Sequence, residues 1–519
     1  MLHMMGEGFY SKQRARRSLW HFLAGKVLAA AAGLFWLIWL VRHAEAADYG
    51  GYVAGLALVE VFYLVTGFGL STRAQRYVAE WRLRAPLAQF QRFVLRLLSQ
   101  RLAVALLGAA LLALFATPLL ARVGLVLGVN AQAALLLWLV AGSVTRQLDE
   151  IFPSLLMQAA SQGLSLLANL ARLAAALVWS MHGQLPGLSQ LLWLEGLAAL
   201  LLALTGLLWL VLALRRDARA RAADGAADLA PPYGNAERRR VELRLYLVQL
   251  MGQAWSGNAA RLLLTHLAGA AQAALLGFAG SLADTLRNYL PAYLLAPWLR
   301  PLMVANWTQQ GRMEPLARVA NAQLKLSFLV LAPLLAYLPQ RGDELAAWLS
   351  KGRYGDGMGL LLGMLMLWLL LQCAHVLLSI VTATVERTGA NLLATLLGCL
   401  FLPAALWLPL QAWGLPVGAT LVAMLCVAEL FWVLLVGAAL RRAGLALPWD
   451  WRGLGKLLVA CLLAAASVAV LPPLPGAATV LALLLSCLLV LAVAVFLKPL
   501  TEAERALLAA VLPRRFLIV

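Results

Sequence analysis

The sequence predicts an all-α polytopic membrane protein with about fourteen transmembrane helices, arranged as two parallel six-helix repeats followed by two C-terminal helices. Three observations lead to this fold class. The chain is unusually apolar, its apolar residues gather in runs of about 20, and short motifs return at one constant spacing along the chain.

The composition excludes an ordinary soluble protein. Of the 519 residues, 63% are hydrophobic and 13% are charged, whereas soluble domains have about 45–50% apolar and about 25% charged residues. A helix of about 20 residues crosses the hydrocarbon layer, and helices satisfy their own backbone hydrogen bonds there. We therefore expect transmembrane helices at residues 20–41, 49–70, 102–120, 131–157, 164–181, 188–214, 245–266, 273–303, 324–338, 358–382, 391–410, 416–440, 454–471 and 477–497.

The basic residues set the expected orientation. The net charge is +19, but most Lys and Arg residues fall in the segments between alternate apolar runs, which is the positive-inside pattern and no indication of nucleic acid binding. An even number of helices then leaves both termini in the cytoplasm. The two most basic segments, 71–101 and 215–244, are interpreted as contacts with anionic lipid head groups.

The N-terminal segment resembles a secretory signal without matching one. Basic residues from Lys12 to Arg17 precede an apolar run, and Ala44-Glu45-Ala46 imitates a cleavage site. The run from Trp20 to Val41 is too long for a signal and contains Lys26. It is therefore expected to be the first membrane helix.

One constant shift relates two halves of the chain. The pattern Gly163-x-x-Leu-Leu-Ala-x-Leu returns from Gly389, and Ala213-Leu-Arg-Arg returns from Ala439 at the same separation. The shift spans six helices, so both halves share one orientation, as parallel repeats do. The expected organisation is an N-terminal lobe (1–214), a cytoplasmic linker (215–244), a C-terminal lobe (245–442) and two extra helices with a cytoplasmic tail (443–519). A central cleft is expected where the lobes meet.

Ionisable residues inside the expected helices are the candidate functional residues, because each costs about 2.5–3.5 kcal/mol at mid-bilayer and needs a partner or a wet cavity. The acids Asp149 and Glu150 follow Arg146 within one helical turn, and Asp284 precedes Arg287 by three residues. These two sets can form ion pairs within a helix. The alternative is that Arg146 and Arg287 face the cleft.

Three cations have no acid within a helical turn: Lys26, Arg172 and Arg261. Either they line the cleft or they pair with an acid on another helix. Cations in a low-dielectric cleft favour an anionic substrate, and Arg is suited to phosphate. The candidate substrate-binding residues are therefore Lys26, Arg146, Arg172, Arg261 and Arg287. The acids Glu60, Asp284 and Glu429 are the candidate ion-coupling residues, although Glu60 and Glu429 could equally pair with unaccompanied cations.

The sequence carries no pattern typical of an enzyme or a metal site. There is no phosphate-binding loop, no His-Glu-x-x-His and no Gly-x-Ser-x-Gly. The five cysteines lie in apolar runs without a Cys-x-x-Cys pair and are interpreted as packing residues. We expect no catalytic residue, no metal and no cofactor. The largest outward segment is expected at about 339–357.

Several short motifs resemble a known family. They are Gly67-Phe-Gly-Leu with Arg73 and Arg76-Tyr-Val-Ala, Gly277-Phe running into Pro291-Ala and Pro301, Lys351-Gly-Arg-Tyr, and Glu386-Arg-Thr-Gly. With these motifs the chain resembles the polysaccharide-transporter (Wzx-type) family of lipid-linked oligosaccharide flippases. That family belongs to the superfamily that also contains lipid II flippases and multidrug exporters. The two extra C-terminal helices fit the flippase-like members better than the twelve-helix exporters.

The resemblance implies a function. Such proteins move an undecaprenyl-diphosphate-linked oligosaccharide, a precursor of lipopolysaccharide, capsule or exopolysaccharide, across the bacterial inner membrane by alternating access. Glycosyltransferases and a polymerase of the same pathway are the implied partners, beside membrane lipids. By analogy, Lys26, Glu60, Arg261, Asp284 and Arg287 would lie nearest the diphosphate. The alternatives are a multidrug exporter, or a membrane scaffold or transferase of a polysaccharide synthase; the coupling ion could be a proton or sodium, or be absent.

Overall fold

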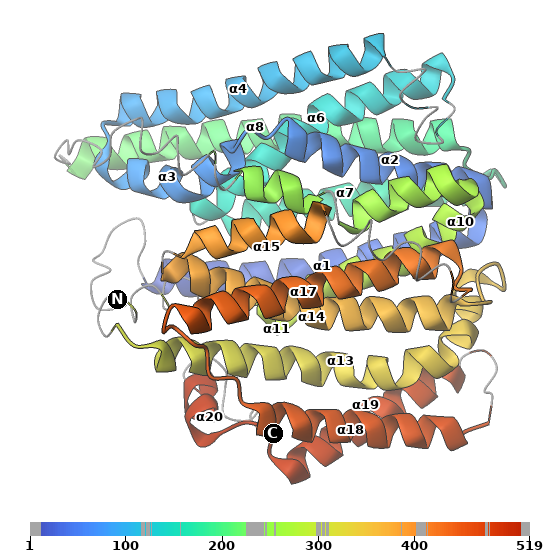
Figure 1. Cartoon of the computed structure of the whole chain (residues 1–519). Helices are drawn as coiled ribbons and strands as arrows, with labels where there is room; N and C mark the ends of the chain where they lie inside the picture. Colours follow the sequence, from blue (N-terminus) through green and yellow to red (C-terminus); the bar gives the residue numbers. More distant parts are fainter. Residues whose placement is uncertain are drawn as a thin grey trace. The chain divides into compact units, whose positions relative to one another are not determined.

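The structure is a computed structural model. It describes residues 12–115, 127–155, 157–224, 246–253, 256–296, 311–385, 387–400, 414–472 and 478–509. A few isolated residues between these ranges are also described. Every regular element in these ranges is a helix (Figure 1). Eleven of the described segments are long and apolar enough to cross a membrane. The expectation of an all-α polytopic membrane protein is confirmed.

The helices of the first half overlap the six spans expected there, although α4 begins well before the expected residue 102 and α3 corresponds to no expected span. They are α1 Lys12–His43, α2 Ala46–Val65, α3 Leu70–Arg84, α4 Leu87–Leu114, α6 Val129–Ser154, α7 Gln158–Met181 and α8 Leu188–Asp224. The basic segment 71–101 is almost entirely helical, because it forms α3 and the first half of α4. The segment expected as a linker begins as a helix too, since α8 continues to Asp224; residues 225–242 lie outside the described ones.

The helices of the second half overlap the remaining expected spans, but the span expected at 273–303 is interrupted after Arg287. They are α10 Gly257–Arg287, α11 Pro291–Leu294, α13 Met313–Ser350, α14 Met358–Thr384, α15 Thr388–Leu400, α17 Val417–Arg442, α18 Trp451–Val470, α19 Ala478–Leu497 and α20 Glu502–Ala509. Helix α13 extends far beyond the expected 324–338. The segment expected as an outward loop at 339–357 is therefore helical as far as Ser350.

Glycines in the left-handed region end or break several helices. Between α2 and α3, Phe68 and Gly69 have φ values of 41° and 74°. Inside α10, Gly269 has a φ of 81° and a ψ of 173°, so α10 contains the end of one expected membrane helix and the start of the next. Residues with a side chain rarely adopt these angles, which is why glycine occupies positions 69 and 269.

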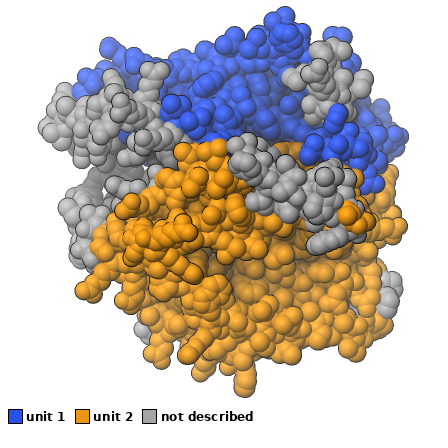
Figure 2. All heavy atoms as spheres, viewed as in Figure 1, with its two compact units in different colours: residues 1–254, 261–274 blue, residues 255–260, 275–519 orange. Residues whose placement is uncertain are grey.

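The chain divides into two compact units (Figure 2). Unit 1 comprises residues 1–254 and 261–274, and unit 2 comprises residues 255–260 and 275–519. Unit 1 has a core of large apolar side chains from α3, α4, α6, α7 and α8, including Phe90, Leu148 and Phe152. In unit 2, α13 packs against α18 and α19 through small residues such as Ala332, Ala460 and Ala464. Small residues allow membrane helices to approach closely.

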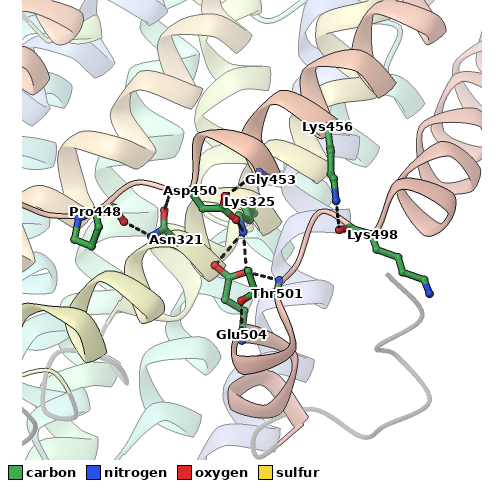
Figure 3. Close-up of polar contacts among 9 residues, drawn as sticks. All are labelled: Asn321, Lys325, Pro448, Asp450, Gly453, Lys456, Lys498, Thr501 and Glu504. Atoms are coloured by element: carbon green, nitrogen blue, oxygen red, sulfur yellow. Dashed lines mark hydrogen bonds and ion pairs between the residues drawn. The ribbon is translucent and has the colours of Figure 1, made fainter.

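A buried ion cluster fastens the C-terminal segments of unit 2 to α13 (Figure 3). The ammonium group of Lys325, which is 1% exposed, lies 2.7 Å from a carboxylate oxygen of Glu504 in α20 and also pairs with Asp450. Asp450 caps the start of α18 by accepting a hydrogen bond from the Gly453 amide. Burial would raise the pKa of the Asp450 carboxyl, but the hydrogen bonds from Lys325 and Gly453 outweigh burial and lower that pKa.

Candidate functional site

The candidate residues fall into the two units. Unit 1 contains Lys26, Glu60, Arg146, Arg172 and Arg261, and unit 2 contains Asp284, Arg287 and Glu429. Within each unit, the structure brings some of these residues into ion pairs that their sequence spacing did not reveal.

Arg172 forms a two-pronged ion pair with Glu195. Arg172 lies on α7 and Glu195 on α8, and two guanidinium nitrogens donate to the two carboxylate oxygens at 2.8 Å each. The side chains are 24% and 2% exposed. This parallel geometry is the strongest form of an Arg–carboxylate contact. Of the two alternatives for Arg172, a cleft cation or an interhelical partner, the structure shows the partner.

The pair is held by polar contacts from two further helices. The hydroxyl of Tyr52 on α2 donates to Glu195 at 2.8 Å. The third guanidinium nitrogen of Arg172 donates to the amide oxygen of Asn169, whose own amide nitrogen donates to the carbonyl of Ala29 on α1 at 2.9 Å. These residues, which we call the Arg172 cluster, connect α1, α2, α7 and α8. Its charges are balanced inside unit 1.

Three carboxylates act on Arg146. It is exposed on α6, and the carboxylates of Glu60 on α2 and of Glu150 and Asp149 on α6 act on it. Asp149 in turn accepts a hydrogen bond from the Ser161 hydroxyl at 3.3 Å. Glu60 therefore acts on Arg146 from a different helix. This agrees with the alternative in which Glu60 accompanies a cation.

The remaining cations of unit 1 differ in burial. Lys26 is half-buried on α1. Arg261 on α10 is 8% exposed, and its carbonyl accepts a hydrogen bond from the Thr265 hydroxyl at 2.8 Å. Arg146, by contrast, is exposed. It is therefore the candidate cation of unit 1 that is most accessible to a ligand.

In unit 2, Asp284 and Arg287 form the ion pair expected from their spacing. Their side chains lie 3.3 Å apart on the second part of α10, and both are about one-third exposed. The guanidinium of Arg287 also lies 6.0 Å from the centre of the Tyr293 ring, which is the outer range of a cation–π contact.

Glu429 has a partner that sequence spacing could not identify. On α17, its carboxylate lies 2.6 Å from the imidazole nitrogen Nδ1 of His375 on α14. The amide nitrogen of Gln372 approaches the other carboxylate oxygen at 3.5 Å. Both alternatives for Glu429, a titratable coupling group and the partner of an unaccompanied cation, stay predictions, because a histidine is a cation only when it is protonated.

Three buried basic residues were not among the candidates, namely Arg82, which pairs with Asp217 at 2.8 Å, Arg101 and Lys325. Arg101 was expected in a cytoplasmic segment, but it lies within α4 and is 1% exposed. Its guanidinium donates to the backbone carbonyls of Tyr63 at 2.8 Å and of Ser143 at 3.3 Å. Tyr63 is in the last turn of α2, where the helix dipole attracts cations. Arg101 therefore fastens α2 and α6 to α4.

No group of three or more metal-ligating side chains occurs in the part of the chain that the structure describes. The absence of a metal, a cofactor and a catalytic residue stays a prediction. Among the residues behind the family resemblance, Pro301, Glu386 and the side chain of Arg76 lie outside the described residues. Lys351 and Gly352 form the left-handed end of α13, so this motif has a structural explanation.

Known proteins match the chain in structure only. No protein-family model matches the sequence, and no curated protein matches it by sequence. The lipid II flippase MurJ, solved in an inward-closed conformation, matches with a TM-score of 0.56 and 12% identity, over 92% of this chain and 98% of that one. A mutant of the Vibrio cholerae MATE transporter VcmN matches with a TM-score of 0.56 and 15% identity, over 83% and 97%.

A third solved structure extends the same likeness. The MATE multidrug transporter DinF-BH matches with a TM-score of 0.55 and 13% identity, over 85% of this chain and 97% of that one. At identities this low the likeness shows the fold. The chain therefore shares its fold with the lipid II flippase MurJ and with MATE transporters.

Proposed function

We propose that this protein is a flippase that moves an undecaprenyl-diphosphate-linked oligosaccharide across the bacterial inner membrane by alternating access. The glycan would be a precursor of lipopolysaccharide, capsule or exopolysaccharide. Both termini would lie in the cytoplasm. The substrate would come from glycosyltransferases and pass to a polymerase of the same pathway.

One observation carries the proposal: the extent of the shared fold. The match to the lipid II flippase covers 92% of the chain, whereas the matches to the two MATE transporters cover 83% and 85%. Lipid II is itself a lipid-linked glycan, so the more extensive likeness is to a protein whose substrate has the proposed chemistry. The expected absence of catalysis agrees with both kinds of neighbour.

The charges of unit 1 support an anionic substrate group. Arg146 is exposed on α6, where the carboxylates of Glu60, Asp149 and Glu150 act on it, and its guanidinium can grip a phosphate with two hydrogen bonds. Lys26 and Arg261 are the further candidates for the diphosphate. Arg172 and Arg287 are engaged in ion pairs, so we assign their charges primarily to those pairs.

The test is transport of a lipid-linked oligosaccharide in proteoliposomes. The purified protein should move the labelled glycan between leaflets, measured by its accessibility to a glycosidase added outside. Arg146→Ala should lower the rate by roughly tenfold or more, equivalent to at least about 1.4 kcal/mol, and Arg146→Lys should lower it less. Arg452→Ala, which removes an exposed arginine on α18, is the matched control and should leave the rate unchanged.

The same preparation separates the competing functions. A multidrug exporter would move a cationic dye and leave the glycan in its original leaflet. A transferase would convert the lipid-linked glycan in detergent, where no second leaflet exists. A scaffold would move neither compound and would tolerate Arg146→Ala in a cellular assay of surface glycan. Any of these three results would overturn the proposal.

A further inference from the structure

Unit 2 contains a titratable pair near the middle of two packed membrane helices. His375 lies in α14 and Glu429 in α17, and these helices pack together. The imidazole Nδ1 and the carboxylate Oε2 are 2.6 Å apart, with side chains 33% and 15% exposed. Among the described residues, His375 is the only ion-pair partner of Glu429.

The imidazole of His375 is also covered by an aromatic ring. The rings of His375 and Trp432 are stacked, with centroids 3.6 Å apart and planes inclined by 3°. The indole nitrogen of Trp432 donates to the hydroxyl of Thr395 on α15 at 3.1 Å, which fixes the orientation of the indole. A cation over an indole face is stabilised by the ring's electrons. The imidazole thus contacts a carboxylate at Nδ1 and an indole on one face.

A chain of hydrogen bonds leads from the pair toward α10. Gln372 donates to Glu429 from its amide nitrogen, and its amide oxygen accepts from the hydroxyl of Tyr293 at 3.2 Å. The Tyr293 ring faces Arg287, which pairs with Asp284. The other titratable groups that act on this chain are the thiols of Cys373 and Cys426.

From this geometry we infer that His375 and Glu429 form a proton-binding site that couples transport to a proton gradient. The inference rests on the proposed function and names its coupling ion. With a neutral imidazole donating from Nδ1, the pair carries one negative charge. A proton accepted at Nε2 gives an imidazolium–carboxylate pair with no net charge. Proton binding therefore removes a net negative charge from between α14 and α17. Because a net charge is costly to bury in a membrane, the two protonation states prefer different packings of these helices.

The stacked indole allows proton binding to be measured without any transport. A protonated imidazole quenches the fluorescence of an indole stacked on it. The difference in emission between the wild-type protein and Trp432→Phe, in lipid nanodiscs, isolates the signal of Trp432 from the other tryptophans. Between about pH 5 and 9, the range where histidines titrate, this difference should fall along a single titration curve as the pH decreases.

Two substitutions assign the titration to the pair. His375→Gln should abolish it, and Glu429→Gln should move its midpoint to lower pH, because a neutral amide replaces the carboxylate beside the imidazole. His266→Gln, which replaces an exposed histidine on α10, should leave it unchanged. Circular dichroism and gel filtration verify that each variant is folded. A flat signal, or a titration that persists in His375→Gln, would overturn the inference.

Two further outcomes keep the inference separate from the proposed function. If sodium chloride, compared with choline chloride, changes the Trp432 signal while pH does not, the site binds sodium and the inference fails. If the signal titrates as expected but the wild-type protein moves no lipid-linked glycan, the proton site stands and the proposed function fails. In proteoliposomes, His375→Gln should retain slow exchange of the glycan and lose its response to an imposed pH gradient.

Discussion

Individual charged residues in this protein are paired by tertiary structure more than by sequence spacing. Arg172 and Glu195 are separated by 23 residues and a helix boundary, yet the guanidinium and carboxylate meet at 2.8 Å. The sequence shows that both residues are charged and lie in expected membrane helices, where a charge is energetically unfavourable. Whether they contact each other depends on how α7 is rotated against α8. Arg101 escapes recognition because it lies among other arginines that are expected in the cytoplasm.

Breaking the Arg172 pair should destabilise the protein strongly. Arg172→Ala leaves the buried carboxylate of Glu195 without its cation, so we expect the free energy of unfolding to fall by about 3 kcal/mol or more. The double variant Arg172→Ala/Glu195→Gln should lose less free energy of unfolding than the sum of the two single variants, because it contains no uncompensated buried charge. Thermal unfolding in detergent measures this.

Additive losses in that double-mutant cycle would mean that the two side chains do not interact. Arg318→Ala provides the control. It removes a half-exposed arginine that pairs with Glu314 on one helix, and exposed pairs of this kind contribute about 0.2–1 kcal/mol.

Among the helices, α13 organises the C-terminal part of unit 2. It contacts α14, α18, α19 and α20. Lys325, in the first half of α13, forms ion pairs with Asp450, which precedes α18, and with Glu504, which follows α19 (Figure 3). The sequence identified α18 and α19 as additional helices from their apolar runs. It could not identify what attaches them, because Asp450 and Glu504 lie 125 and 179 residues from Lys325.

Glu504→Gln should loosen the attachment of these C-terminal segments. The substitution removes one of two acidic partners of a lysine that is 1% exposed, so we expect a loss of about 3 kcal/mol. Limited proteolysis should also cleave the C-terminal segment faster. Glu502→Gln, on an exposed position of the same helix, is the matched control; equal behaviour of the two variants would show that the ion cluster contributes nothing.

Across the whole chain, several helix boundaries follow the spacing that the motifs suggested. Helices α4 and α13 begin at Leu87 and Met313, which are as far apart in the sequence as the motif glycines 163 and 389. The left-handed break at Gly269 follows His43, the end of α1, at the same separation. These offsets agree with the expected repeat of six helices. The boundaries of the two lobes and their orientation in the membrane stay predictions.

The expected orientation can be measured with reporter fusions. Green fluorescent protein fluoresces when it is fused on the cytoplasmic side, and alkaline phosphatase is active on the opposite side. Fusions of the first reporter at either terminus should fluoresce, and alkaline phosphatase inserted after Gly352 should be active, because the basic segments hold the alternate loops in the cytoplasm. Fluorescence at one terminus only would mean that the number of spans is odd.

Although it did not predict the ends of α4 and α13, the amino-acid order was sufficient for the all-α membrane fold and the approximate positions of the helices. These properties depend on local quantities, namely the length of each apolar run and the cost of leaving backbone groups unpaired in lipid. The partners of Arg172, Lys325 and Glu429 were settled by the folded structure. A contact between helices depends on how each helix is rotated and how deeply it packs. Neither quantity can be predicted from the spacing of residues along one segment.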